Sequence, residues 1–242
     1  MFRLIGGDIY RLLRKKSLFI YIGALAAGYF ALAFIRSGGF TEESLVNDAL
    51  SLFIVLPALV GGYLFAAVYT DDLSSKNLVS LVGFGLNKAA VIIAKFMVTV
   101  LFSAVIFGLM PLYHTAIYTV LGQKATGNMA AIIYAASLKH LLTAIAFSAL
   151  SGIVVYGLQR ATFAIVAYLL LAFGVVGSLV SIALNTFAPT LTEHLMSGIT
   201  DRILLCMMSG KSLTGPVIEY IVYVLLALAL SIVAFYRKEM EF

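Results

Sequence analysis

The sequence predicts an all-α membrane protein that forms a single transmembrane domain over residues 1–242. Of its 242 residues, 62% are hydrophobic and 11% are charged, whereas a soluble domain carries about 25% charged residues. Apolar runs long enough to cross a bilayer, about 20 residues each, occur at 17–35, 49–69, 89–110, 141–158, 161–183 and 216–236. Lipid contact accounts for most apolar patterns in such a chain, so the polar segments are the better guide to function.

Residues 1–16 predict an amphipathic helix that lies in the membrane interface before the first span. Apolar side chains recur there at helical spacing, with basic groups mostly on the other sides. A signal peptide is the alternative. The run at 17–35 is longer than the 7–15 residues of a typical signal-peptide core, and no A-x-A site follows it, so we expect this segment to be retained.

Pro111 should end or kink the third span, because proline lacks the backbone N–H that a helix uses. Lys124, Lys139 and His140 then suggest that much of 112–140 lies at the interface. The last outer loop, 184–215, has apolar residues at helical spacing and predicts a short helix at the outer leaflet.

The distribution of Lys and Arg predicts that both termini lie in the cytoplasm. With the N-terminus inside, the inner segments hold 11 basic residues and the outer segments hold 5. The net charge of +5 therefore reflects the inner loops, and we expect no nucleic-acid partner. We find no convincing internal repeat, which gives no support to an inverted-repeat transporter.

Motifs for bond chemistry are weak in this sequence. Gly210-Lys211-Ser212 resembles the end of a phosphate-binding loop, but Leu205 stands where that motif needs a glycine. No His, Cys or acidic pair has metal-ligand spacing, and no G-x-S-x-G occurs. We therefore expect a protein that is not an enzyme, with no catalytic residue, metal or cofactor of its own.

Ionisable residues within the spans lie near the span ends. Lys95 is one to two turns inside the third span and is expected to reach the cytoplasmic headgroups. His114 and Glu219 lie near the outer surface. The absence of a charge at mid-membrane weighs against an ion-coupled carrier, which stays as an alternative.

The polar segment 71–95 is the strongest functional candidate, although a plain solvated loop is the simpler reading. Asp71 and Asp72 follow the second span directly, and Lys88 and Lys95 open the third. Between them, Leu78, Leu81, Val82 and Leu86 form an apolar face before two glycines. The pattern predicts a short cytoplasmic helix that can carry a push from a soluble partner into the spans.

At these residues the sequence resembles the ABC-2 family of ATP-binding-cassette exporter permeases. That family has six spans, an N-terminal interfacial helix and an acid after the second span, an order matched by Asp72, Leu78-Val79-Ser80-Leu81, Lys88 and Lys95. The sequence departs at Lys76-Asn77, where Gly-Thr is usual, and at Gly83-Phe84-Gly85, where Pro is usual. Compact members include bacteriocin-immunity and phenol-soluble modulin exporter permeases.

The resemblance implies the multi-pass membrane subunit of an exporter in the plasma (inner) membrane of a bacterium. It would move an amphipathic peptide or other hydrophobic substrate outward, as a dimer with a second copy or a related permease. ATP and Mg would be bound by a separate ABC ATPase subunit. That subunit would dock on the coupling helix between spans two and three, with a second contact between spans four and five. The residues implied for this coupling are Asp72, Lys76, Asn77, Leu78, Leu81, Val82, Phe84, Leu86, Lys88, Gln159 and Arg160.

Five aromatic residues are candidates for the substrate pathway, and packing against lipid is the alternative role for each. They are Tyr29, Phe53, Tyr63, Tyr168 and Phe173. Ala144, Ser148 and Gly152 add a small-residue stripe that predicts close helix approach, within one subunit or between two. The alternative function for the whole chain is a non-pumping membrane immunity or assembly factor.

Overall fold

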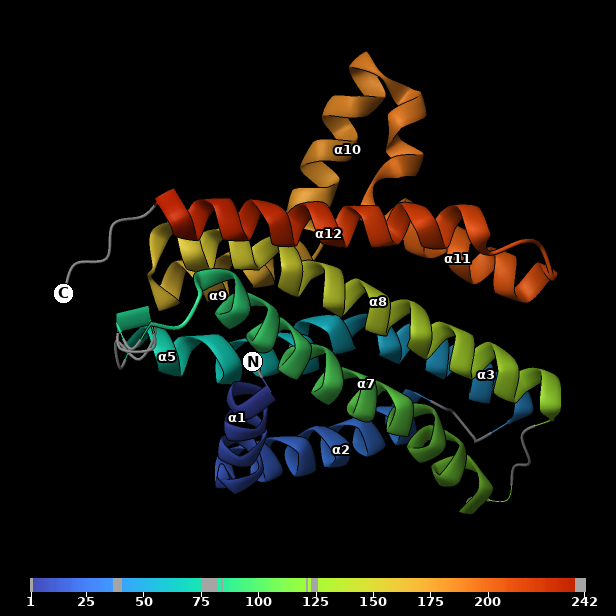
Figure 1. Cartoon of the computed structure of the whole chain (residues 1–242). Coiled ribbons are helices and arrows are strands. Elements are labelled where there is room, and N and C mark those ends of the chain that lie inside the picture. The colour runs from blue at the N-terminus through green and yellow to red at the C-terminus, as the bar shows by residue number, and fades with distance from the viewer. Residues whose placement is uncertain are drawn as a thin grey trace.

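A computed structural model describes residues 2–36, 41–74, 82–83, 85–120, 122 and 126–237 of the chain (Figure 1). The regular elements in these ranges are all helices. In chain order they are α1 (Phe2–Arg14), α2 (Lys16–Arg36), α3 (Glu42–Leu52), η1 (Phe53–Val55), η2 (Pro57–Gly61), α4 (Gly62–Phe65), η3 (Ala66–Thr70), α5 (Asp71–Ser74), α7 (Lys88–Val120), α8 (Gly127–Leu158), α9 (Ala161–Ala172), α10 (Val175–Phe187), η4 (Pro189–His194), α11 (Met196–Ser209) and α12 (Thr214–Arg237).

Five stretches of helix in the described residues are long and apolar enough to cross a membrane. They are Lys16–Ile35, Ser44–Thr70, Lys88–Val120, Gly127–Leu158 and Thr214–Arg237. The bent pair α9 and α10 makes a sixth if it is counted as one span. The architecture is that of a multi-span helical membrane protein. It agrees with the predicted six spans if α9 and α10 together are counted as one span.

The third and fourth spans are longer than the sequence predicts. Helix α7 passes through Pro111 to Val120, and α8 begins at Gly127, so most of 112–140 is helix. The end predicted at Pro111 is therefore wrong. Proline removes the N–H that would reach the carbonyl of Phe107, and the Ser137 hydroxyl from α8 donates to that oxygen instead, at 2.6 Å.

The second span changes helix type several times along its length. It passes through α3, the 3₁₀ turn η1, and the π-helical turns η2 and η3 that flank α4. Irregular backbone inside a membrane needs polar partners from neighbouring elements. Two tyrosine hydroxyls are partners of this kind. Tyr168 donates to the Pro57 carbonyl and Tyr21 donates to the Leu59 carbonyl, each at 2.9 Å.

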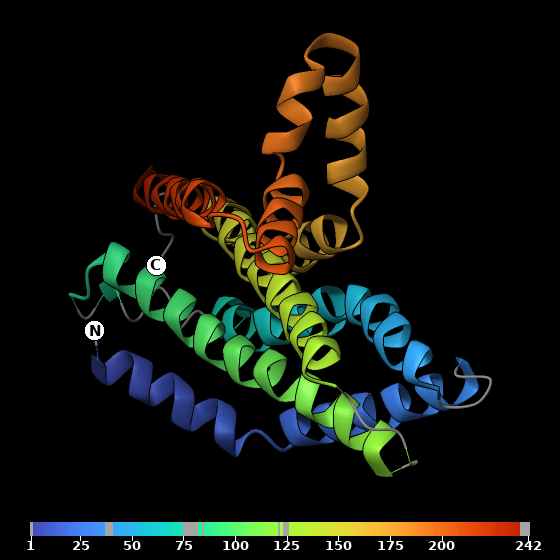
Figure 2. The same ribbon diagram turned by 90° about the vertical axis from the view of Figure 1, so that its right-hand side faces the viewer.

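The run predicted as one fifth span is broken at Gly174. This glycine has φ of 74°, in the left-handed region that favours glycine, and α9 and α10 meet there at 57°. Helix α10 and η4 then stand away from the other helices (Figure 1, Figure 2). The helix predicted in the last outer loop is formed by α11, which packs against α8 and α12.

Helix α8 occupies the centre of the bundle, with α7 on one side and α11 and α12 on the other (Figure 2). Its small residues Ala144, Ser148 and Gly152 are buried. A Cβ built on Gly152 would lie 3.1 Å from the Ser231 hydroxyl of α12. The predicted close approach of helices at this stripe is thus present within one chain.

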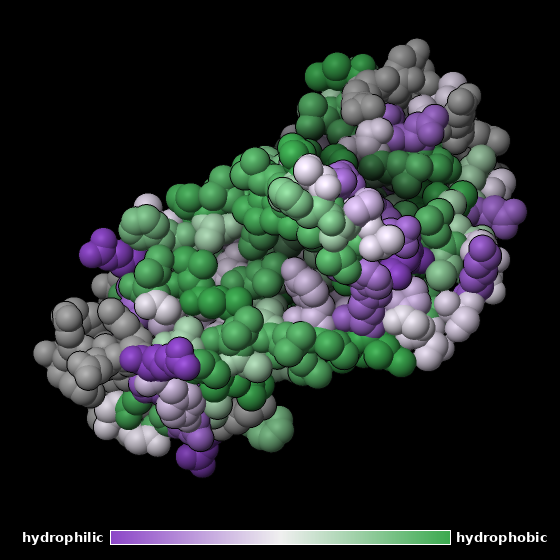
Figure 3. All heavy atoms as spheres, turned by 90° about the horizontal axis from the view of Figure 1, so that it is seen from above, coloured by the Kyte–Doolittle hydropathy of each residue, from purple (hydrophilic) through white to green (hydrophobic). Residues whose placement is uncertain are grey.

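The surface is mainly apolar. In Figure 3, hydrophobic side chains cover most of the visible face, and hydrophilic side chains gather toward two ends. Large apolar side chains such as Phe34, Leu179 and Leu225 are exposed on three of the helices that make up the candidate spans. A surface of this kind suits contact with lipid.

We predict that Ser137→Ala destabilises the folded protein by about 1–3 kcal/mol, because the Phe107 carbonyl is left buried without a donor. The measurement is thermal unfolding of the purified chain in detergent. Ser231→Ala is the matched control, since that buried hydroxyl donates to the Ala227 carbonyl of its own helix. Equal melting points for the two variants would contradict the role assigned to Ser137.

Candidate functional site

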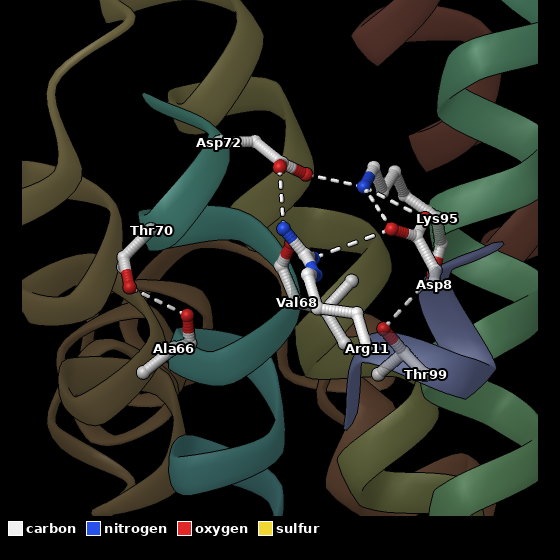
Figure 4. Close-up of polar contacts among 8 residues, drawn as sticks. All are labelled: Asp8, Arg11, Ala66, Val68, Thr70, Asp72, Lys95 and Thr99. Atoms are coloured by element: carbon white, nitrogen blue, oxygen red, sulfur yellow. Dashed lines mark hydrogen bonds and ion pairs between the residues drawn. The ribbon is translucent and has the colours of Figure 1, made fainter. Parts of the chain in front are cut away.

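Four charged side chains from three helices meet where the second and third spans approach each other (Figure 4). Asp8 and Arg11 come from α1, Asp72 from α5 and Lys95 from α7. The Lys95 ammonium lies 2.8 and 2.7 Å from the two Asp8 oxygens and also pairs with Asp72 Oδ2. The Arg11 guanidinium lies 2.6 Å from Asp72 Oδ1 and 3.3 Å from Asp8 Oδ1. We call these four residues the ionic network.

The ionic network is buried and electrically balanced. Lys95 is 2% exposed, Asp72 3% and Asp8 8%, while Arg11 is partly exposed. Two cations face two carboxylates, so each buried charge has an opposite partner. Taking a charge out of water is costly, and removing one member leaves its partner buried and uncompensated. The four residues therefore fix α1, α5 and α7 to one another.

Backbone contacts extend the ionic network into the neighbouring turns. Arg11 also reaches the carbonyl of Val68 in η3, at 3.5 Å. The Thr99 hydroxyl donates to the Lys95 carbonyl at 3.0 Å, and Thr70 donates to Ala66 at 2.5 Å (Figure 4). Asp72 thus lies directly after the second span and before residues 75–88, which we call the candidate coupling segment.

Lys95 does not reach the lipid headgroups, contrary to the sequence expectation. Its side chain is instead buried, and its ammonium pairs with the carboxylates of Asp8 and Asp72. Sequence reasoning missed Asp8 and Arg11 as site residues. The available clue was a lone acid in a basic amphipathic helix together with a lysine inside a span.

The structure describes six of the eleven residues implied in coupling. Lys76, Asn77, Leu78, Leu81 and Phe84 lie outside the described residues. Of the others, Asp72 belongs to the ionic network, and Val82 and Leu86 are partly buried against the core.

Lys88 and the link between the fourth and fifth spans complete the coupling set. Lys88 donates to the Phe235 carbonyl at 2.9 Å and lies 5.0 Å from that ring centre, which joins α7 to the end of α12. Gln159, with φ of 52°, ends α8, and the exposed Arg160 precedes α9.

A second buried polar cluster lies further along α7, and we call it the histidine cluster. His114 Nε2 lies 2.7 Å from the Leu45 carbonyl, which can only accept, so this nitrogen carries a hydrogen. In the neutral ring, Tyr29 then donates to Nδ1 at 2.7 Å. Tyr118 donates to Asp48 at 2.5 Å. The cluster connects α2, α3 and α7.

The distance along α7 between the ionic network and the histidine cluster is close to the thickness of the hydrocarbon layer of a membrane. From Lys95 to His114, α7 advances about 28 Å at about 1.5 Å per residue, close to the hydrocarbon thickness of about 30 Å. Polar side chains therefore gather at the two edges of the apolar layer, and the stretch of α7 between them is almost entirely apolar.

The structure brings together some of the predicted pathway aromatics. Tyr29 and Phe53 have ring centres 6.2 Å apart beside the histidine cluster, and Tyr63 stacks on a tyrosine of α2. Tyr168 is fully buried against the second span. Phe173 is 66% exposed at the end of α9, apart from the others.

Comparison with known proteins adds no relative. No family model matches the sequence, and no curated protein matches it. No group of three or more His, Cys, Asp or Glu that could hold a metal ion occurs in the part of the chain that the structure describes. The class is therefore defined by the helical membrane architecture, and the ionic network is its candidate functional site.

We predict that Lys95→Met lowers the free energy of unfolding by about 3–5 kcal/mol, because it leaves two buried carboxylates with one cation. Adding Asp8→Asn should restore part of the loss. The measurement is thermal unfolding in detergent.

Lys139→Met is the control for this prediction. Lys139 pairs with Asp201 at 2.5 Å, but both side chains are partly exposed, and such a pair contributes about 0–1 kcal/mol. A loss for Lys95→Met no larger than for Lys139→Met would contradict the role of the ionic network.

Proposed function

We propose that this chain is the permease subunit of an ATP-binding-cassette exporter that moves an amphipathic peptide or other hydrophobic substrate out of the cell. The chain itself performs no bond chemistry, and ATP with Mg is bound by a separate ATPase subunit. Two permease copies form the pathway in a bacterial plasma membrane, with both termini in the cytoplasm. The ABC-2 resemblance at 72–95 supports this proposal, and so does the multi-span helical architecture.

The observation that carries the proposal is the position of Asp72. This residue ends the second span and opens the candidate coupling segment, and its carboxylate pairs with Arg11 of α1 and Lys95 of α7. A force applied beyond Asp72 would therefore reach three elements together. Lys88, bonded to the end of α12, provides a second connection from the same segment to the last span.

In the proposed mechanism, closure of the ATPase subunits pushes the segment 75–88. Because the ionic network is buried and balanced, α1, α5 and α7 move as one unit, since separating them would expose unpaired charges to a weakly polar surrounding. The second span is the element best suited to absorb this movement, because its 3₁₀ and π-helical turns are less regular than an α-helix.

The histidine cluster favours one alternative, an ion-coupled carrier. Asp48 and His114 are buried ionisable residues within candidate spans, and residues of this kind often mark proton pathways. A carrier would lose transport when the proton gradient collapses while ATP stays high. An exporter driven by an ATPase would keep transporting under that condition.

We predict that affinity purification of the full chain from its native membrane yields an ATPase subunit in stoichiometric amount. In proteoliposomes the complex should hydrolyse ATP and export a fluorescent amphipathic peptide. A chain that purifies alone and still protects cells would instead be the non-pumping factor. Transport that depends on the proton gradient would identify the carrier.

We further predict that Asp72→Glu keeps the ATPase bound and active but lowers transport, by about tenfold for each 1.4 kcal/mol of coupling lost. The longer side chain keeps its charge but shifts the link to Arg11 and Lys95. Asp201→Glu is the matched control at a partly exposed ion pair. Unchanged transport in folded Asp72→Glu would exclude the ionic network from coupling.

A further inference from the structure

Tyrosine side chains hold helix α2 at a distance from its neighbours. Only 17% of the first span is buried, compared with 61% of the second. Four hydrogen bonds bridge the gap: Tyr21 to the Leu59 carbonyl at 2.9 Å, Tyr63 to Ser17 Oγ at 3.2 Å, Tyr113 to the Ala26 carbonyl at 2.7 Å, and Tyr29 with His114 Nδ1 at 2.7 Å. In each case the hydrogen bond is made by the hydroxyl at the end of a long, rigid tyrosine side chain, so α2 is attached to its neighbours without close packing.

The gap is a cavity of about 480 Å³ between α2, the second span and α7. Its wall is made of aliphatic and aromatic side chains, including Leu25, Leu56, Phe102 and Ile106, and none of the described residues lining it is charged. The hydroxyls of the four tyrosines in its wall are already bonded across the gap. A water molecule needs two to four polar partners to be held in such a place, and this wall offers almost none.

The cavity is long and narrow. Lining residues on α2 run from Leu18 to Leu32, about 21 Å of helix at about 1.5 Å per residue. A volume of about 480 Å³ over that length corresponds to a passage narrower than an α-helix, which is about 10–12 Å wide. A helical peptide therefore does not fit between these helices.

An extended peptide is excluded for a different reason. Its backbone N–H and C=O groups would enter an apolar space without partners, at a cost of several kcal/mol each. A hydrocarbon chain has no such groups and matches the shape and chemistry of the wall. Each methylene that leaves water gains about 0.8 kcal/mol, but a chain already in the bilayer gains only the closer packing.

The cavity opens toward the bilayer. Phe19, Leu32, Val105 and Leu109 line it and are also exposed on the surfaces of α2 and α7. These helices are candidate membrane spans, so the sides that are exposed in one chain are open to lipid tails. A lipid tail can thus enter while its headgroup stays outside the apolar layer.

We propose that this cavity binds one acyl chain of a bilayer lipid between α2, the second span and α7. The bound chain fills the space that the tyrosines leave open and supports α2 where protein packing is sparse. This inference goes beyond the proposed export function and does not depend on it, since it concerns a structural lipid in one chain rather than a transported substrate.

Fluorescence quenching by lipids with brominated acyl chains tests the site, because the protein has no Trp. Phe102→Trp places a reporter in the wall of the cavity, and Met110→Trp is the second choice if the first variant does not fold. Leu225→Trp reports on open lipid contact from the exposed face of α12. The full chain is reconstituted in phosphatidylcholine vesicles with an increasing fraction of the brominated lipid.

We expect quenching of the wall reporter to rise in proportion to the brominated fraction, as for one bound chain. Quenching at the α12 reporter should rise more steeply, because that surface touches several lipids. Gly28→Leu should lower quenching at the wall reporter, because the leucine side chain would take up part of the space proposed for the acyl chain. Gly28 lines the cavity and a Cβ there meets no atom within 4 Å.

Gly23→Leu is the matched control. Gly23 lies in the same helix, a Cβ there also meets no atom within 4 Å, and it does not line the cavity. Both changes give the same gain in helix propensity. Equal quenching in the two variants, no quenching of the wall reporter, or quenching of it by aqueous iodide instead would each overturn the proposal.

Discussion

The Lys95 ammonium, held between the carboxylates of Asp8 and Asp72, is the interaction on which the arrangement at this end of the molecule depends. Its charge is buried in a wall of apolar helices, a position tolerated only with opposite charges in contact. Arg11 completes the balance and adds a contact to the last turns of the second span. As a result the ionic network joins the N-terminal helix to the end of the second span and to the start of the third. The candidate coupling segment begins at this junction.

Hydroxyl groups serve a related purpose within the spans. Ser137 replaces the donor that Pro111 removes, and Tyr168 and Tyr21 donate to carbonyls of the irregular second span. Each bond joins two helices and also satisfies backbone that the membrane would leave unpaired. The same residues thus permit departures from regular helix and decide which helices lie together, while the histidine cluster fixes the opposite end of α7.

Hydropathy alone was sufficient to predict the all-helical membrane class, because repeated apolar runs of about 20 residues are typical of membrane-spanning helices. The end predicted at Pro111 was wrong because the compensating donor, Ser137, comes from another helix, and a lone proline in a sequence gives no sign of that. The ionic network was missed for the same reason. Asp8 and Lys95 are 87 residues apart, and charge type alone cannot show which acid meets which base. The coupling, partner and substrate predictions rest on family resemblance, which a fold of this class does not decide.

The burial of Asp8 has a consequence for how the protein is made. Translation releases Asp8 and the first span well before Lys95 has left the ribosome, since N-terminal elements emerge first. Until the third span is inserted, the Asp8 carboxylate lacks the ammonium that makes its buried position tolerable. The docked position of α1 therefore requires the third span to be in place.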